Sequence, residues 1–247
     1  MTKPIYESIG TGYNYTRCTD PDVYAQLAPT WSGATRILNV GAGSGSYEPQ
    51  NVPVVAVEPS RKMIAQRPTQ AHPSVCSYAE TLPFGDHVFS HCLSVLTLHH
   101  WHDRAAAYAE IKRVTQKRFI TLTWDPDAPS FWLTEDYFPE ILAADRQIFP
   151  TMDELAEHFG DIKIIPMLIP AACQDGFFAA FWKRPQAYLD PEVRRAMSPF
   201  AKRADNDPGT QRLQQDLADG TWAAKYTALE SLQHFDAGYR IVYADLD

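Results

Sequence analysis

The chain has 247 residues, of which 45% are apolar and 12% aromatic, and its formal net charge is −8. This length suits one large domain or one core with an added cap, and the apolar content suffices for a sizeable hydrophobic core. The negative charge argues against a protein that binds nucleic acid or an anionic membrane, because both need a basic face.

The four cysteines lie far apart and show no metal-ligand spacing, so we expect reduced thiols and no metal site. The N-terminus has no apolar signal region, and no stretch of about 18 apolar residues occurs. These features predict a cytoplasmic protein without a transmembrane helix, present as a monomer or a homodimer.

The first half of the chain alternates short helices with short apolar strands. Helices are expected to begin at Asp20, Ser60 and Asp103, where a side-chain oxygen can cap the first free backbone N–H groups. The expected strands are residues 37–40, 54–57, 88–98 with an exit loop, and 119–124. Because the first two are apolar at nearly every position, they are typical of parallel strands buried on both faces.

The second half is less regular. Residues 125–150 are rich in proline and aromatic side chains, a capped helix is expected from Thr151 to Gly160, and a strand is expected over 162–169. Residues 171–236 are expected to be mostly helical, and Tyr239–Ala244 to return to the sheet as a strand. The predicted division of the single domain 1–247 is an N-terminal helical cover (1–30), a cofactor-binding core (31–124), a lid segment (125–150), further core (151–170), a helical lid (171–236) and a final core strand (237–247).

A glycine cluster, Gly41, Gly43 and Gly45, directly follows the first core strand, and Glu58 ends the next strand. Glycines at such a turn let the backbone approach a ligand, and a carboxylate at the neighbouring strand end can accept hydrogen bonds from ribose hydroxyls. A dinucleotide-binding loop would have glycine at position 46, where this chain has Ser46. A plain structural turn beside a chance acid is the second alternative.

Together with four further segments, this loop resembles the class I S-adenosylmethionine-dependent methyltransferases, in particular the small-molecule group that includes the ubiquinone/menaquinone-biosynthesis and trans-aconitate methyltransferases. These segments are the aromatic pattern from Tyr6 to Arg17, Val57–Ile64, Ala79–Phe84, and Leu98–Trp101 with Glu110–Val114. The resemblance implies an α/β, Rossmann-like fold with a mostly parallel seven-stranded sheet flanked by helices and with helical lid insertions.

The resemblance also implies roles for individual residues around S-adenosylmethionine and its product S-adenosylhomocysteine. Gly41, Ala42 and Gly43 would lie against the methionine part, and Tyr13 and Arg17 would close over its amino-acid end. The remaining implied contacts are Glu58 with the ribose, Pro59, Met63, Ala79 and Glu80 around the adenine, and Leu93 and Ser94 near the sulfonium. Tyr78 stands where many relatives have an aspartate that binds the adenine amine.

Two further groups are candidates for chemistry on the acceptor. His99 and His100 lie at a strand exit, and since imidazole titrates near neutral pH either is a candidate general base; shaping the cofactor pocket is the simpler alternative. Aromatic side chains in the lids would bind an apolar or aromatic substrate, or simply pack the lids on the core. The candidate substrate-binding residues are Trp124, Asp125, Phe131, Trp132 and Asp175.

The sequence thus predicts transfer of a methyl group to a small, apolar or aromatic molecule by in-line displacement in an enclosed pocket. An NAD-dependent oxidoreductase and a non-catalytic cofactor-binding module remain as alternatives. Methyl transfer from a sulfonium needs positioning more than a strong base, so oxygen, nitrogen and carbon acceptors all remain open.

Overall fold

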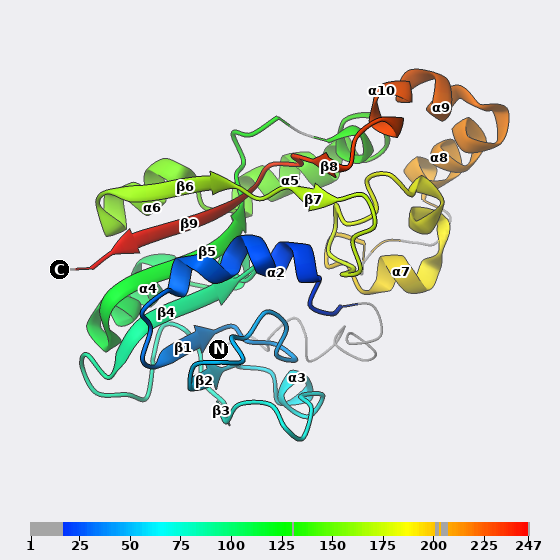
Figure 1. The fold of residues 1–247 in the computed structure, drawn as a ribbon. Coiled ribbons are helices and arrows are strands. Elements are labelled where there is room, and N and C mark those ends of the chain that lie inside the picture. Colours follow the sequence, from blue (N-terminus) through cyan, green and yellow to red (C-terminus); the bar gives the residue numbers. More distant parts are fainter. Residues whose placement is uncertain (1–16, 130, 201–202, 204–206, 247) are drawn as a thin grey trace.

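A seven-stranded sheet runs through the computed structural model, which describes residues 17–129, 131–200, 203 and 207–246 (Figure 1). Its strand order is β3-β2-β1-β4-β5-β9-β6. The strands are β1 (Ile37–Val40), β2 (Val54–Val57), β3 (Ser74–Val75), β4 (Phe89–Val95), β5 (Thr115–Trp124), β6 (Ile162–Pro166) and β9 (Tyr239–Asp245). The pairs from β3 to β5 are parallel, whereas β9 runs antiparallel to both β5 and β6. This mostly parallel sheet confirms the predicted Rossmann-like fold.

The central strands are buried because their side chains are apolar on both faces. All four residues of β1 are buried, and Ile37 lies opposite Val54 of β2 and His91 of β4. Parallel strands of this kind end at one edge of the sheet, so the segments after β1, β2 and β4 come together there. That edge holds the glycine loop, Glu58 and the β4 exit loop.

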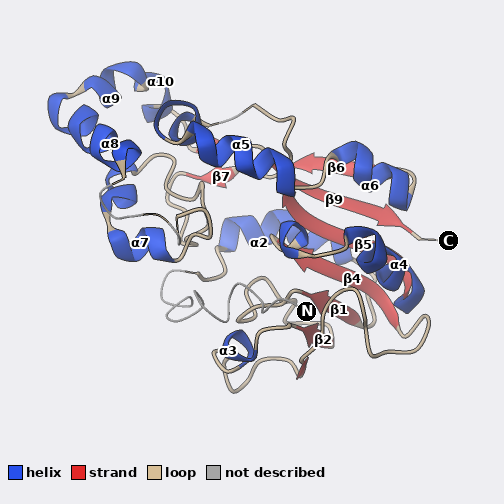
Figure 2. Ribbon diagram, turned by 180° about the vertical axis from the view of Figure 1, so that it is seen from behind, coloured by secondary structure: helices blue, strands red, loops and turns tan. Residues whose placement is uncertain are grey.

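Helices cover both faces of the sheet, as the two opposite views show (Figures 1 and 2). Helix α2 (Pro21–Leu27) lies on one face, and α4 (Arg104–Val114) and α6 (Met152–Phe159) lie on the other. The expected capping residues begin these helices: Asp20 accepts hydrogen bonds from Asp22 and Val23, and Thr151 accepts one from Glu154. The short helix α3 (Arg61–Ile64) begins in the same way at Ser60.

The first lid segment contains more helix than the sequence predicts, and the start of the second contains less. Residues 125–150 hold a π-helical turn, η4 (Leu133–Tyr137), and the ten-residue helix α5 (Pro139–Ile148). The helical lid contains η5 (Pro185–Leu189), α7 (Pro191–Arg195), α8 (Pro208–Asp219), α9 (Thr221–Lys225) and α10 (Thr227–Glu230). Its first part, residues 171–184, forms turns, so the expectation of helix is wrong there.

Two strand boundaries also differ from the expected ones. The strand expected over 162–169 breaks after Pro166, and β7 (Ile169–Pro170) pairs instead with β8 (His234–Phe235). Proline has no N–H to donate to a sheet, which explains a break at this point. Strand β5 begins at Thr115, four residues earlier than expected, because Thr115 already pairs with Phe89.

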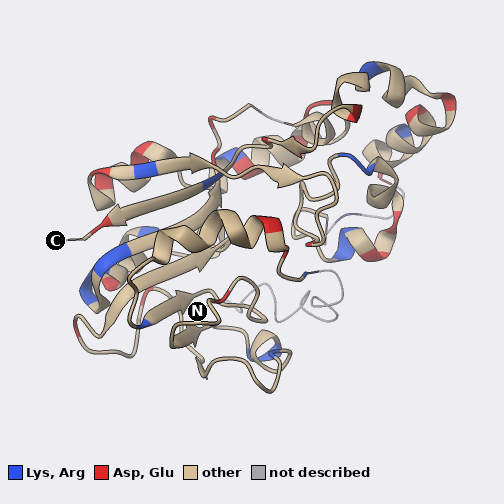
Figure 3. Ribbon diagram, in the orientation of Figure 1, with Lys and Arg blue, Asp and Glu red and all other residues tan. Residues whose placement is uncertain are grey.

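Basic and acidic residues are interspersed along the described ribbon (Figure 3). Among the helices that the structure describes, none combines the length and the apolar character needed to cross a membrane.

Candidate cofactor and acceptor site

The glycine loop after β1 has a backbone that only glycine adopts easily. The φ angles of Gly41, Gly43 and Gly45 are 72°, 52° and 100°, all in the left-handed region. A Cβ atom on Gly41 would lie 2.1 Å from Oγ1 of Thr97, so the loop also packs directly against the β4 exit loop. By contrast, a Cβ atom on Gly43 would meet only Cε of Met63, at 3.4 Å.

Glu58, at the end of β2, ties this loop to the start of α3. Its Oε2 accepts a hydrogen bond of 2.9 Å from the Gly43 N–H, and its Oε1 accepts one of 2.9 Å from the Ser60 N–H. The side chain is buried, but each carboxylate oxygen can accept a further hydrogen bond. The carboxylate is therefore fixed in place and still able to bind hydroxyl groups.

A buried ion pair between Arg67 and Glu48 lies next to the glycine loop. Arg67 Nη2 lies 2.8 Å from Oε2 of Glu48, and Asn39 Nδ2 donates to Oε1 of Glu48 over 3.0 Å. Asn39 Oδ1 is buried and has no hydrogen-bond partner among the described residues. Asn39, Glu48 and Arg67 were not among the residues expected at the site; the available signal in the sequence is a polar Asn39 inside an otherwise apolar strand.

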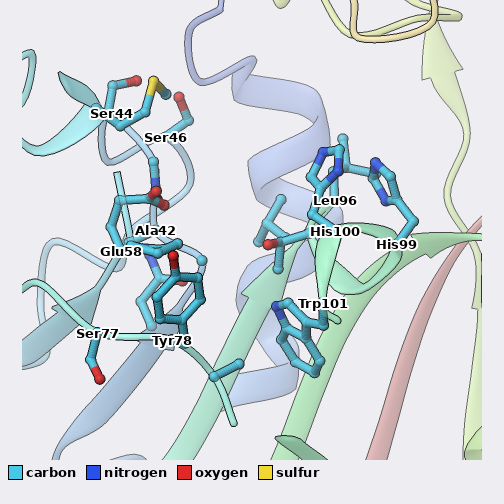
Figure 4. A pocket seen from close by; sticks show the side chains of 18 of the residues that line it. Ala42, Ser44, Ser46, Glu58, Ser77, Tyr78, Leu96, His99, His100 and Trp101 are labelled. Carbon is cyan, nitrogen blue, oxygen red and sulfur yellow. Dashed lines mark hydrogen bonds between the residues drawn. The ribbon is translucent and has the colours of Figure 1, made fainter. Parts of the chain in front are cut away.

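These elements surround a cavity of about 310 Å³, here called the cofactor cavity. Figure 4 shows Ala42, Glu58 and Tyr78 along one side of it and Leu96, His100 and Trp101 along the opposite side. The first wall comes from the loops after β1, β2 and β3, and the second from the exit loop of β4.

Most of the predicted cofactor residues line this cavity. They are Arg17, Gly41, Ala42, Gly43, Glu58, Pro59, Met63, Ala79 and Glu80. Tyr78, whose departure from the family pattern the sequence showed, lines it too. Tyr13 lies outside the described residues.

The predicted positions of Leu93 and Ser94 near the sulfonium are wrong. Both side chains are fully buried within β4, and neither lines the cavity. Strand β4 ends at Val95, and Val95, Leu96 and Thr97 at its exit line the cavity instead. Leu96 has a φ of 52°, a strained value for a side chain of this size, and such strain is concentrated at functional sites.

A second cavity, of about 420 Å³, adjoins the first and is here called the acceptor chamber. The two cavities share Arg17, Leu96, His99 and His100 as lining residues. Helix α5 and the segments around Phe177 and Met197 supply much of the remaining wall, which is largely apolar and aromatic. The strained Leu96 and the two histidines thus stand where one cavity meets the other.

The structure divides the predicted substrate residues into two groups. Trp124 and Phe131 line the acceptor chamber. Trp132 does not, because its ring packs among Tyr137, Tyr188 and Trp222 inside the lid and its indole N–H donates to the Trp182 carbonyl. We therefore correct the assignment of Trp132 to substrate binding: it belongs to the core of the lid.

The two predicted acidic anchors also lie outside the chamber lining. Asp125 faces Arg240 at 3.8 Å and caps the following turn. Asp175 is completely buried, and it accepts hydrogen bonds from Arg17 Nε (2.8 Å), the Tyr47 hydroxyl (2.9 Å) and the Gly176 N–H (2.7 Å). Asp175 therefore holds Arg17 at the junction of the cavities and does not itself line the chamber.

Burial favours the neutral form of the two histidines at the junction. It lowers the pKa of His99 well below its usual range and that of His100 to about 4, and nearby Arg17 lowers both further. Each is therefore a weaker base than an ordinary imidazole, which argues against the expected role as general base. The His99 ring stacks on Phe149 at 4.0 Å, and its Nδ1 has no partner among the described residues.

The cofactor cavity fits S-adenosylmethionine. The missing side chain of Gly43 leaves room for a ligand against the backbone, and Glu58 offers acceptor oxygens to ribose hydroxyls. The orphaned Asn39 Oδ1 is an acceptor available for a ligand N–H or O–H group. The neutral histidines place no positive charge beside a sulfonium.

Part of the chain matches known proteins in sequence. A family model described as a methyltransferase domain matches residues 38–119. An Escherichia coli protein, the uncharacterized YafE, is 49% identical over 52 residues, a match that spans 21% of this chain and only a quarter of YafE.

Solved structures extend the similarity over nearly the whole chain. A candidate methyltransferase from an antibiotic biosynthesis pathway of Anabaena variabilis is 32% identical, with a TM-score of 0.84 over 93% of this chain and 99% of that one. Phosphoethanolamine N-methyltransferase 2 of Haemonchus contortus, solved with S-adenosylmethionine, has a TM-score of 0.53 at 17% identity and shares the fold; the match covers 92% of this chain and 53% of that one. The chain belongs to the class I S-adenosylmethionine-dependent methyltransferases.

Proposed function

We propose that the protein transfers the methyl group of S-adenosylmethionine to a small apolar or aromatic acceptor held in the acceptor chamber. The observation that carries the proposal is the junction of the two cavities at Arg17, Leu96, His99 and His100. A donor on one side and an acceptor on the other would meet there.

The chain supplies position and enclosure. Glu58 and the glycine loop hold the adenosine and methionine parts, and the Asp175–Arg17 pair fixes a guanidinium at the junction. When bound, S-adenosylmethionine supplies an activated methyl group, whose sulfur is already a good leaving group. The aromatic wall of the chamber excludes water and aligns the acceptor for in-line displacement.

The nature of the chamber supports a small acceptor. Its wall includes Trp124, Phe131, Phe149, Phe177 and Tyr239, which offer flat apolar surfaces. A volume of about 420 Å³ suits a ligand of a few fused or linked rings at most.

Turnover of a labelled methyl group tests the proposal. The protein is incubated with methyl-labelled S-adenosylmethionine and the small-molecule fraction of a cell extract, and labelled products are separated by chromatography and identified by mass spectrometry. We expect label in one or a few apolar small molecules. Label found only in intact protein, DNA or RNA would contradict the proposal.

Calorimetry separates the alternative functions. S-adenosylhomocysteine should bind, and NAD should not, because Ser46 replaces the glycine of the dinucleotide loop. Tight NAD binding would favour an oxidoreductase. Binding of S-adenosylmethionine without any labelled product would favour a non-catalytic module.

A further inference from the structure

One carboxyl group faces the acceptor chamber from the apolar side of α5. Asp145 lies four residues after Ile141 and three before Ile148, so the three side chains share one face of the helix. All three line the chamber. Asp145 is half-buried, and an acidic residue on a face that otherwise carries isoleucines is unusual, because even partial burial of a carboxylate without a partner costs free energy.

Asp145 differs from the other acidic and cationic residues around the chamber because it is unpaired. Arg17 pairs with Asp175 at 2.8 Å, and Arg203 pairs with Glu140 at 2.6 Å. No hydrogen bond or ion pair joins the Asp145 carboxyl to any residue that the structure describes. The chamber therefore holds a carboxyl group for which the described residues offer no partner.

We propose that Asp145 binds the amino group of the methyl acceptor and accepts the proton that the nitrogen releases, so that the acceptor is a small apolar or aromatic amine. This inference rests on the proposed function above and names its substrate class. In an apolar chamber, an amine is the group that best complements an unpaired carboxylate, through a charge-assisted hydrogen bond.

The proton balance of the reaction follows from this position. An alkylamine binds as its ammonium ion, so the carboxylate of Asp145 first takes one N–H proton and frees the nitrogen lone pair. The lone pair then forms a bond to the methyl carbon while the carbon–sulfur bond breaks, and the electron pair of that bond remains on sulfur. The methylated nitrogen leaves as an ammonium ion, and the proton taken first stays on Asp145. The protonated Asp145 afterwards releases this proton to water when the chamber opens.

The histidines and Tyr239 around the chamber are less suited than Asp145 to accept a proton from the amine. Burial lowers the pKa of His99 and His100, which remain neutral, and burial raises the pKa of Tyr239, whose hydroxyl also stays neutral. On α5 itself, Arg146 Nε donates to the Pro126 carbonyl. Burial raises the pKa of Asp145 to about 7, so the carboxylate forms in the neutral range, where a general base is most effective.

Binding of probe amines tests the inference without turnover. The wild-type protein is first titrated with S-adenosylhomocysteine. The loaded protein is then titrated with tryptamine and phenethylamine beside 3-propylindole and propylbenzene, the isosteres in which a methyl group replaces the amino group. At about pH 8 we expect the amines to bind at least about tenfold more tightly than these methyl isosteres. At about pH 6 that preference should shrink by up to about tenfold, because most Asp145 carboxyls are then protonated.

Two matched variants assign the effect to Asp145. In Asp145→Asn the preference for amines should disappear, while binding of S-adenosylhomocysteine and of the methyl isosteres is retained. Asp153→Asn makes the same change at an exposed carboxylate on α6 and should behave as the wild type does. Methyl transfer to whichever amine binds should fall at least tenfold in Asp145→Asn alone.

The outcomes distinguish this inference from the proposed function. Failure of the wild type to bind S-adenosylhomocysteine would reject the proposed function itself. Normal binding of S-adenosylhomocysteine with no preference for amines, or with a preference that survives in Asp145→Asn, would reject only the role of Asp145.

Discussion

The carboxylate of Glu58 accepts a hydrogen bond of 2.9 Å from the backbone N–H of Gly43, which joins the end of β2 to the glycine loop after β1. The acid and the loop therefore act as one unit, and a change in either affects the same ligand site.

Replacement of Glu58 by alanine tests whether its carboxylate binds the cofactor. We expect Glu58→Ala to weaken binding of S-adenosylhomocysteine by about tenfold or more, because charge-assisted hydrogen bonds worth roughly 1.5–3 kcal/mol are lost. Calorimetry gives the affinity, and circular dichroism checks that the variant is folded. Glu58→Gln keeps one acceptor oxygen and should lose less. A folded Glu58→Ala that binds with unchanged affinity would remove Glu58 from the cofactor site.

Replacement of Gly43 tests whether the loop binds the cofactor, and Gly220 offers a matched control. Both glycines have positive φ angles (52° and 84°), and a Cβ atom would meet no close neighbour at Gly220 and only Met63 Cε at Gly43. Alanine should therefore cost each variant about 1 kcal/mol of unfolding free energy. Only Gly43→Ala should also weaken binding of S-adenosylhomocysteine, since only that methyl group enters the cofactor cavity. Equal affinities in the two variants would make the loop a plain structural turn.

Replacement of Trp132 tests its assignment to the core of the lid. Trp132 is only 4% exposed and packs among aromatic rings, so Trp132→Ala should lower the free energy of unfolding by roughly 3–5 kcal/mol. Urea denaturation measures this loss. Binding of S-adenosylhomocysteine to the folded fraction should remain, because the ring lines neither cavity. An unchanged unfolding midpoint would show that Trp132 does not stabilise the lid core.

The pH dependence of stability tests whether the pKa of Asp145 is raised in the folded protein. Its pKa in the folded protein, about 7, lies above the ordinary value of 3.8, so the folded state loses stability as the pH rises from about 4 to about 7. Asp145→Asn removes this penalty. The variant should be more stable than the wild type at about pH 8, and its advantage should be smaller at about pH 5 by on the order of 1–2 kcal/mol. Thermal melts of both proteins at the two pH values measure the difference. An advantage that does not change with pH would show that Asp145 ionises normally.

The cofactor half of the site was largely predictable from the sequence, whereas the acceptor half was not. The glycine loop and Glu58 follow strands whose apolar runs are easily recognised, so their meeting at one sheet edge follows from parallel pairing. Ala79 and Glu80 were identified through the family resemblance alone, because the two-residue strand β3 before them was not expected. Leu93 and Ser94 were misplaced because the sequence alone did not show where β4 ends.

The acceptor chamber is built by segments far apart in the chain, whose packing no local pattern reveals. Trp132 and Phe131 are neighbours in sequence, yet one packs inside the lid and the other lines the chamber. Asp145 had a local signal, an acid at helical spacing from Ile141 and Ile148, but residues 125–150 were interpreted as weakly periodic, and the face of α5 went unrecognised. The low pKa values of the histidines depend on burial, which neighbours in sequence do not determine.

A crystal structure of the complex with S-adenosylhomocysteine tests the central claim most directly. We expect the ribose beside Glu58, the amino-acid end along Gly41–Gly43, and the sulfur atom directed at the junction formed by Leu96, His99 and His100, so that a methyl group on it would face the acceptor chamber. S-adenosylhomocysteine bound elsewhere, or with its sulfur turned away from a junction closed by side chains, would contradict methyl transfer from the cofactor cavity into the acceptor chamber.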